Sequence, residues 1–439
     1  MKRIFIITLI FSLSLSVAQE ESKTGWSFGA LPAIAYDSDA GWTYGALGNI
    51  YNYGDGAYYP DYLYSIYAEI SRTTKGGGIN KLFFDSKYLL PADIRITSEL
   101  SLLTESTLPF YGFNGYEAQY NPSYEISDTT DENYDANLYR TRVYYRHRRD
   151  MTKFTADFLK NMGDMPIKGV VGLSYINVDV GPVNIEDINK GNTEDLLPDS
   201  VNTLYDNYVV YGLISSDEMD GGKANYLKFG LVYDTRDQEA NPMKGMWTEI
   251  LLMAYPSFLG NESAYTLATM THRQYFTMKK DILSIATRFA VQQVISGNIP
   301  FYNMPYLQSS FKPQEGLGGS KTVRGLLKNR VVGDGFALFN LEARWKFLRT
   351  KVAGQNLYLA FNGFVDGGYV YDNHPYDNAS YYHIYSDGSE MEKEALHLSY
   401  GGGFRVALNQ NFIVAADMGF AKDERDGNSG LYIGLGYLF

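Results

Sequence analysis

The sequence contains no cysteine. This absence excludes disulfide bridges, thiolate catalysis, thiolate metal sites and a lipoprotein anchor on a cysteine. The sequence also has few basic residues, since 38 Lys and Arg face 50 Asp and Glu and leave a net charge of -12. Nucleic-acid binding relies on a basic surface that neutralises phosphates, so we expect no nucleic-acid partner.

Long apolar runs are missing as well. After the first residues, no stretch approaches the roughly 18 consecutive apolar residues that a transmembrane helix needs, and the mean hydropathy is -0.26. At the start, Lys2 and Arg3 precede an apolar run of about a dozen residues, and small residues stand at positions 16 and 18. This pattern predicts a secretory signal peptide over residues 1–18, with the mature chain forming a single domain over 19–439.

What the chain does have is 39 Tyr, 24 Phe and 43 Gly, which suits strands with aromatic girdles at membrane interfaces. Periodicity of two is clearest over 336–347. One set of alternating positions is apolar there, and the other carries Asn340, Glu342, Arg344 and Lys346. Residues 226–234 and 282–292 alternate in the same way. Apolar side chains facing outward and polar ones facing inward indicate a membrane-spanning β-barrel.

Counting such segments predicts about sixteen strands, an even number as single-chain bacterial barrels require. The expected strands are 26–36, 41–54, 60–73, 78–91, 94–106, 138–159, 166–180, 224–235, 245–257, 263–278, 281–296, 335–349, 355–370, 396–408, 411–421 and 430–439. In 138–159 the apolar phase shifts by one near Arg149, which we interpret as a β-bulge, because splitting the segment would make the count odd.

The connections alternate in length. Residues 91–93, 163–164 and 279–280 form tight turns, whereas 107–136, 181–223, 297–334 and 371–395 are long. Short turns face the periplasm and long loops face outside in such barrels, so both termini are expected in the periplasm.

The long loop 297–334, which is the sixth extracellular loop of the predicted barrel, contains Gly316-Leu317-Gly318-Gly319-Ser320-Lys321-Thr322-Val323-Arg324-Gly325. A phosphate-binding loop is excluded, because that motif needs Gly directly before Lys and a strand-to-helix context. The segment instead resembles the Val-Arg-Gly-aromatic signature of the BamA/TamA and two-partner-secretion superfamily, although Leu326 stands where the aromatic is usual. The resemblance implies that this loop folds back into an outer-membrane barrel and places Arg324 among lumenal acidic groups.

A guanidinium in a narrow lumen needs a carboxylate partner. Phe364-Val365-Asp366-Gly367-Gly368 resembles the family's Phe-x-Asp-x-Gly strand. Parity places Asp366 on the inward face together with Tyr358 and Asn362, so Asp366 is the predicted partner of Arg324.

Further matches follow in the family order, and the resemblance covers about residues 26–439. Tyr233-Asp234-Thr235-Arg236-Asp237, followed by Pro242 and Gly245, is similar to a strand-and-turn motif. Glu342 and Arg344 lie in the strand after the sixth loop, and Arg405 and Asp417 lie in segments that resemble the penultimate strands. The family strand motifs are therefore assigned to Asp234, Arg236, Asp237, Glu342, Arg344, Arg405 and Asp417.

The last strand places Leu431, Ile433, Leu435, Tyr437 and Phe439 on one face and ends on an aromatic residue. This looks like the terminal signal that the outer-membrane assembly machinery reads on a barrel, carried by Tyr437 and Phe439. Because a bare strand edge is not tolerated in lipid, we expect this strand to pair with the first one.

The resemblance implies outer-membrane biogenesis, namely insertion or translocation of proteins or lipids through a barrel whose first and last strands separate. Between Gln19 and Trp26 we expect no room for a POTRA domain of roughly 75 residues. A partner is therefore expected: a second copy, or an accessory periplasmic or membrane subunit, besides lipid and the machinery that inserts the barrel itself. The alternative is a passive outer-membrane channel or a structural barrel.

An enzyme is not expected, and neither is a cofactor or a metal ion. The sequence lacks the Gly-x-Ser-x-Gly elbow of a lipase. The five histidines, His147, His272, His374, His383 and His397, are scattered among strands and loops, and no Ser/His/Asp set can be nominated from their spacing.

Overall fold

The computed structural model describes residues 24–59, 62–131, 134–191, 193, 196–239, 241–310, 314–352, 355–376, 381, 383–385, 392–408 and 412–439. The predicted signal peptide, residues 1–18, lies outside the described residues. In this described part of the chain, no helix is both long enough and apolar enough to cross a membrane.

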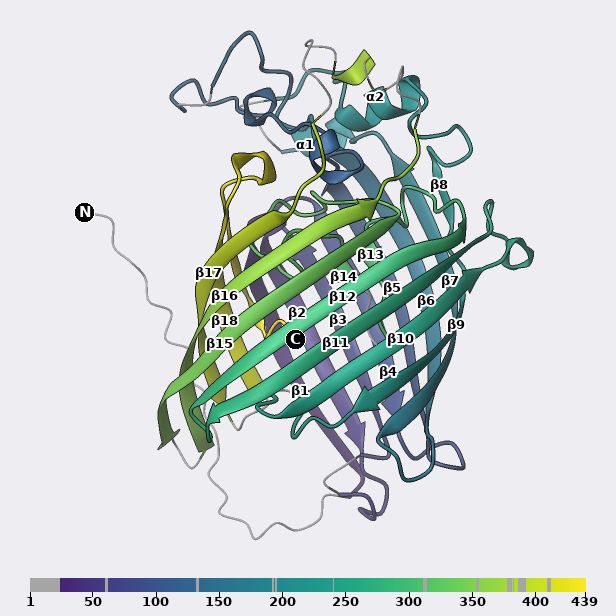
Figure 1. Ribbon diagram of the computed structural model, residues 1–439, viewed down its shortest axis with the longest axis vertical. Helices are drawn as coiled ribbons and strands as arrows, with labels where there is room; N and C mark the ends of the chain where they lie inside the picture. The colour runs from purple at the N-terminus through teal and green to yellow at the C-terminus, as the bar shows by residue number, and fades with distance from the viewer. Residues whose placement is uncertain are drawn as a thin grey trace.

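The described strands form one closed antiparallel barrel (Figure 1). Its wall consists of β1 (Trp26–Asp37), β2 (Gly41–Asn52), β3 (Tyr64–Thr73), β4 (Gly77–Ser86), β5 (Ile94–Pro109), β6 (Arg146–Asn161), β7 (Ile167–Gly181), β8 (Gly221–Lys223), β9 (Leu227–Asp234), β10 (Gly245–Tyr255), β11 (Tyr265–Lys279), β12 (Leu283–Gly297), β15 (Gly335–Val352), β16 (Gln355–Asp372), β17 (His397–Leu408), β18 (Phe412–Ala421) and β19 (Ser429–Leu435). Each strand pairs with its neighbours in the chain, and β1 pairs with β19 to close the wall.

The described sheet has 17 strands, but β8 and β9 both pair with β7 and continue one another. Between them, the backbone N–H of Ile176 on β7 donates to the side-chain Oδ1 of Asn225 at 2.6 Å, so a side chain replaces one backbone bond of the ladder. Counting β8 and β9 as one span gives the predicted sixteen.

The predicted alternation is confirmed. On β15, Asn340, Glu342 and Arg344 are buried inside the barrel, whereas Leu341 and Trp345 are 45 % and 52 % exposed on its outer surface. On β16, Tyr358, Asn362 and Asp366 face inward and Phe361 and Val365 face outward, as parity predicted. The period of two therefore places the polar residues in the lumen and an apolar surface around it.

The longest connections gather at one end of the barrel, called here the loop end, and the connections at the other end, called the turn end, are no longer than that of residues 53–63 (Figure 1). The loop end carries α1 (Ile185–Asn189), α2 (Leu204–Val210) and the short 3₁₀ helices η1 (Gly115–Glu117), η2 (Pro122–Tyr124), η3 (Ser257–Leu259) and η4 (Glu424–Asp426). Loop 298–334 contains the small ribbon of β13 (Tyr306–Leu307) and β14 (Gln314–Glu315).

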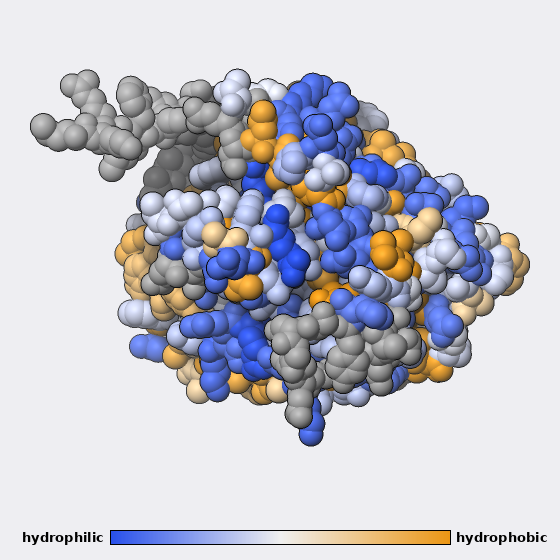
Figure 2. All heavy atoms as spheres, turned by 90° about the horizontal axis from the view of Figure 1, so that it is seen from above, coloured by the Kyte–Doolittle hydropathy of each residue, from blue (hydrophilic) through white to orange (hydrophobic). Residues whose placement is uncertain are grey.

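An aromatic cluster joins these loops over the lumen. Phe110 lies edge-on to Tyr208 with ring centroids 5.1 Å apart and to Phe301 at 6.3 Å, and Tyr205 packs against the same Phe301. Seen from above, the same end shows mainly hydrophilic side chains with scattered hydrophobic ones (Figure 2). The loops thus bury a shared apolar core and present a polar outer surface.

The predicted strand 138–159 is wrong at its start, because β6 begins only at Arg146. The preceding residues form turns, and Tyr144 and Tyr145 are buried in the aromatic cluster. The bulge also lies elsewhere: Glu105 pairs with Arg149 and Leu108 with His147, so the extra residue is on β5. Contacts within the loops, rather than strand periodicity, set this boundary.

The closing seam between β1 and β19 is short. β1 pairs with β2 over its whole length, from Trp26 to Asp37. With β19 it forms only two residue pairs, Tyr36 with Ile433 and Asp37 with Tyr432, among the described residues. Ser38 adds hydrogen bonds to the backbone of Leu431. The rest of this edge of β1 has no described partner strand.

Candidate functional site

Loop 298–334 folds back into the barrel, and its described residues fill part of the lumen. Leu317, Thr322 and Val323 are completely buried. The hydroxyl of Thr322 donates to the carbonyl of Gly316 at 2.6 Å and accepts from the N–H of Gly318 at 3.0 Å, which folds the glycine-rich segment into a tight turn. Gly318 has φ +118°, and a Cβ there would lie 1.9 Å from the carbonyl oxygen of Leu327. A glycine is therefore required at this position.

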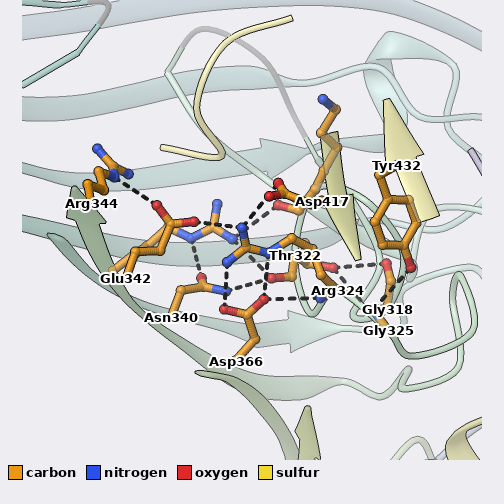
Figure 3. A network of polar contacts seen from close by, with 12 residues as sticks. Gly318, Thr322, Arg324, Gly325, Asn340, Glu342, Arg344, Asp366, Asp417 and Tyr432 are labelled. Atoms are coloured by element: carbon orange, nitrogen blue, oxygen red, sulfur yellow. Dashed lines mark hydrogen bonds and ion pairs between the residues drawn. The ribbon is translucent and has the colours of Figure 1, made fainter. Parts of the chain in front are cut away.

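Arg324 is the central cation of the loop and is fully buried (Figure 3). Its Nε and Nη2 donate to the two carboxylate oxygens of Asp366 at 2.8 and 3.1 Å. Its Nη1 lies 2.6 Å from Glu342 and 3.4 Å from Asp417. The guanidinium also lies 3.5 Å from the ring centroid of Phe364. The structure thus brings Arg324 and Asp366 together and adds two further carboxylates from the wall.

Two more arginines balance these carboxylates. Arg344 donates from Nε to Glu342 at 2.8 Å, and Arg405 forms two parallel bonds to Asp417, both at 2.8 Å. Three arginines therefore face three carboxylates across β15, β16, β17 and β18. Such a buried set is sensitive to single deletions, because removing one partner leaves an uncompensated charge.

A second group of contacts was not predicted and holds the main chain of the loop. Arg288 on β12 donates from Nη2 to the carbonyl of Lys321 at 3.0 Å and from Nε to Asn340 at 2.7 Å. Asn340 in turn donates to the carbonyl of Thr322 at 2.7 Å. Asn340 belongs to the polar positions predicted to face inward, and Arg288 is a polar residue of the alternating segment 282–292, but a loop backbone has no periodicity that would identify it as their partner.

The loop also reaches the closing seam. The N–H of Gly325 donates to the hydroxyl of Tyr432 on β19 at 3.1 Å. The N–H of Lys328 lies 3.4 Å from Asp39, in the turn between β1 and β2. Leu326, where the family has an aromatic residue, is buried in the apolar cluster of Leu317 and Val323. The docked loop therefore contacts both sides of the junction between the first and last strands.

Asp234, Arg236 and Asp237 lie away from this network, at the turn end. Arg236 donates to Asp234 at 2.9 Å, and its guanidinium lies 4.5 Å from the ring of Trp247. Asp237 accepts from the backbone N–H of Met243 at 3.0 Å. These residues shape the turn 235–244.

The prediction that Tyr437 and Phe439 continue the face of the last strand is wrong. β19 ends at Leu435, and Gly436 adopts φ +85°, which turns the chain into the lumen. Arg344 lies 4.4 Å from the ring of Tyr437 and donates to the carbonyl of Phe439 at 2.9 Å. Phe439 is buried beside Tyr275. The expected pairing of the last strand with the first is present at Tyr36–Ile433 and Asp37–Tyr432, but residues 437–439 make lumenal contacts instead of extending it.

The loop end has a small charged turn of its own. Hydrogen bonds from Arg425 hold the pKa of Asp423 at about 2. The backbone N–H and the Nε of Arg425 donate to Asp423 at 3.0 and 2.9 Å, and Asp423 thereby caps η4. This short helix places Asp426 where its carbonyl accepts from the N–H of Leu327 at 2.9 Å.

Solved structures share this architecture. BamA from Haemophilus ducreyi lacking POTRA domains 1–3 matches with a TM-score of 0.55 and 14% identity, over 94% of this chain and 71% of that one. CdiB from Escherichia coli matches with a TM-score of 0.53 and 10% identity, over 94% of this chain and 63% of that one, so the chain spans less than two thirds of CdiB. At these identities the likeness concerns the fold.

Among curated proteins, no sequence is significantly similar to the chain. The family model of the Omp85 superfamily domain, however, matches residues 75–439, which include the sixth loop and all strands from β4 onward. This chain belongs to the Omp85 superfamily.

Proposed function

We propose that this barrel acts in outer-membrane biogenesis, inserting or translocating proteins or lipids together with a partner or as an oligomer. In this proposal the barrel lies in the bacterial outer membrane, with its loop end outside and its turn end in the periplasm. No residue is assigned a catalytic role.

The observation that carries the proposal is the short seam. From Ala35 back to Trp26, the edge of β1 has no partner strand among the described residues, and β19 itself ends at Leu435, where Gly436 turns the chain into the lumen. Unpaired backbone groups are costly in lipid, and such an edge is a template for another strand. A client strand that pairs with β1 would satisfy these groups, as in β-augmentation.

A partner is part of the proposal because the turn end offers little surface to hold an unfolded chain. The connection between β11 and β12, for instance, spans only residues 280–282. Recognition of a client therefore requires either a second copy or an accessory periplasmic or membrane subunit.

Depletion of the protein tests the proposal. We expect depletion to lower the content of other barrel proteins or of lipid in the outer membrane, and native cross-linking in mild detergent to capture a partner or a second copy. Unaltered membrane composition, together with a monomer that co-purifies with nothing, would contradict it.

A passive channel is the second candidate, and one feature of the lumen favours it. Most contacts of the sixth loop are with β12 and β15–β18. Two cavities of about 340 and 370 Å³ lie along the inner faces of β1–β5 and share Glu69 in their lining, and Lys328 is the residue of the sixth loop that lines the first of them. Steady conductance of the purified barrel in planar bilayers, combined with no effect of depletion on membrane composition, would support this candidate.

A further inference from the structure

A cavity of about 500 Å³ lies at the turn end of the barrel. Its walls come from the turn 235–244, the turn 280–282 and the inner faces of β15 and β16. It is separate from the sixth loop, none of whose residues line it.

The turn 235–244 is fixed across this cavity. The amide of Asn241 donates to the hydroxyl of Tyr358 on β16 at 2.8 Å, and the hydroxyl of Thr277 donates to the carbonyl of Met243 at 2.9 Å. Asn241 and Met243 are buried as a result. The cavity is therefore held open by hydrogen bonds and needs no rearrangement to receive a ligand.

The lining carries more positive than negative charge. Its cations are Lys244, Lys280, Lys346 and Arg349, and its carboxylates are Asp237 and Asp281. Both carboxylates are engaged: Asp237 accepts from the backbone of Met243 and Lys244, and Asp281 lies 3.8 Å from Arg349. Four cations against two carboxylates leave a surplus of two positive charges.

Lys346 is the cation of the lining that most favours a bound anion, because its ammonium points into the cavity without a carboxylate partner among the described residues. Its Nζ lies 3.3 Å from the sulfur of Met243 and 4.9 Å from the ring centroid of Tyr358. A thioether is a weak acceptor and a ring face a modest one. A half-buried ammonium in such surroundings binds an anion favourably.

We propose that this cavity binds an acidic segment of a partner polypeptide, whose carboxylates pair with Lys346 and its neighbouring cations. Lys346 and Tyr358 stand on the lumenal faces of their strands, so a lipid headgroup in the surrounding bilayer does not reach them. The proposed orientation opens the cavity to the periplasm. The inference names a chemistry for the partner in the proposed function and rests on that function.

Binding of a fluorescein-labelled, aspartate-rich peptide to the purified full-length barrel in detergent tests this. We expect anisotropy to show saturable binding that weakens with salt, and Lys346→Gln to weaken it by about tenfold or more, the worth of one charge-assisted hydrogen bond. Lys346→Arg retains binding. The matched control is Lys351→Gln, which removes an exposed lysine of β15 that does not line the cavity.

Three results would overturn the inference. The first is that the peptide does not bind. The second is that wild type and a folded, heat-modifiable Lys346→Gln bind it with equal affinity. The third is that inorganic phosphate displaces the peptide at equal anion concentration, which would indicate a small-anion site instead. The assay needs no client, so its failure leaves the depletion test untouched. Conversely, peptide binding by a barrel whose depletion changes nothing contradicts only the function.

Discussion

Replacing Arg324 with alanine should release the sixth loop from the lumen. The substitution removes both side-chain bonds to Asp366, the contacts with Glu342 and Asp417, and the stacking on Phe364. Glu342 keeps Arg344, and Asp417 keeps Arg405. Asp366 keeps only the backbone N–H of residue 324, at 3.2 Å, among the contacts described for it.

The size of the effect follows from that one orphaned carboxylate. Breaking a buried ion pair from one side costs about 3–5 kcal/mol. Since 1.4 kcal/mol corresponds to a factor of ten, the ratio of docked to undocked loop should fall by about two orders of magnitude or more. The strand pairings that form the wall do not involve Arg324, so the barrel itself stays folded.

Limited proteolysis of the folded barrel measures this release. We expect cleavage within 298–334 to accelerate strongly in Arg324→Ala, and to accelerate less when Asp366→Asn is added, because the orphaned charge is then gone. Lys321→Ala is the control, since it removes an exposed cation of the same loop. Unchanged cleavage in both Arg324→Ala and Asp366→Ala would refute the idea that this pair holds the loop.

Three further predictions concern the barrel and its seam. The protein should migrate differently on gels before and after boiling, since the strand ladders pair the backbone groups around the wall except along most of the β1 edge; identical mobility together with recovery in a soluble fraction would argue against the barrel. Phe439→Ala should lower the temperature at which this shift occurs, because deleting a buried aromatic side chain costs about 3–5 kcal/mol, whereas exposed Phe258→Ala should not. Burial and the nearby Asp37 raise the pKa of Asp39 to about 6, so ionised Asp39 destabilises the fold. Asp39→Asn should therefore raise the temperature of the gel shift. The full increase is expected above pH 6, a progressively smaller one between pH 6 and 4, and none below pH 4; an equal effect at pH 7.5 and 3.5 would contradict this.

The sequence predicts the barrel wall well because lipid on one side and a polar lumen on the other impose a period of two on every strand. The same parity, with the family resemblance, indicated that Asp366 faces Arg324. Parity could not show that Arg288 and Asn340 bind the backbone of the loop. Every residue has a backbone carbonyl, so no sequence pattern identifies the carbonyls that accept these hydrogen bonds.

Two errors have local physical causes. The segment before Arg146 alternates well enough for a strand, but Tyr144 and Tyr145 gain more burial in the aromatic cluster of the loops. At the other end of the chain, the alternation of Tyr437 and Phe439 is intact, yet the left-handed Gly436 turns both into the lumen. Period-two patterns cannot reveal where one glycine redirects a strand.

The most direct test of the proposed function is the folding rate of an unfolded barrel protein added to liposomes that contain this protein. The chain has no cysteine, so Tyr36→Cys with Ile433→Cys allows a single disulfide across the seam, and Ala46→Cys with Ile70→Cys gives the matched lock between β2 and β3. We predict that the protein accelerates folding of the client, that oxidation of the seam pair abolishes the acceleration, and that oxidation of the control pair does not. Equal acceleration with the seam locked and unlocked would contradict the account.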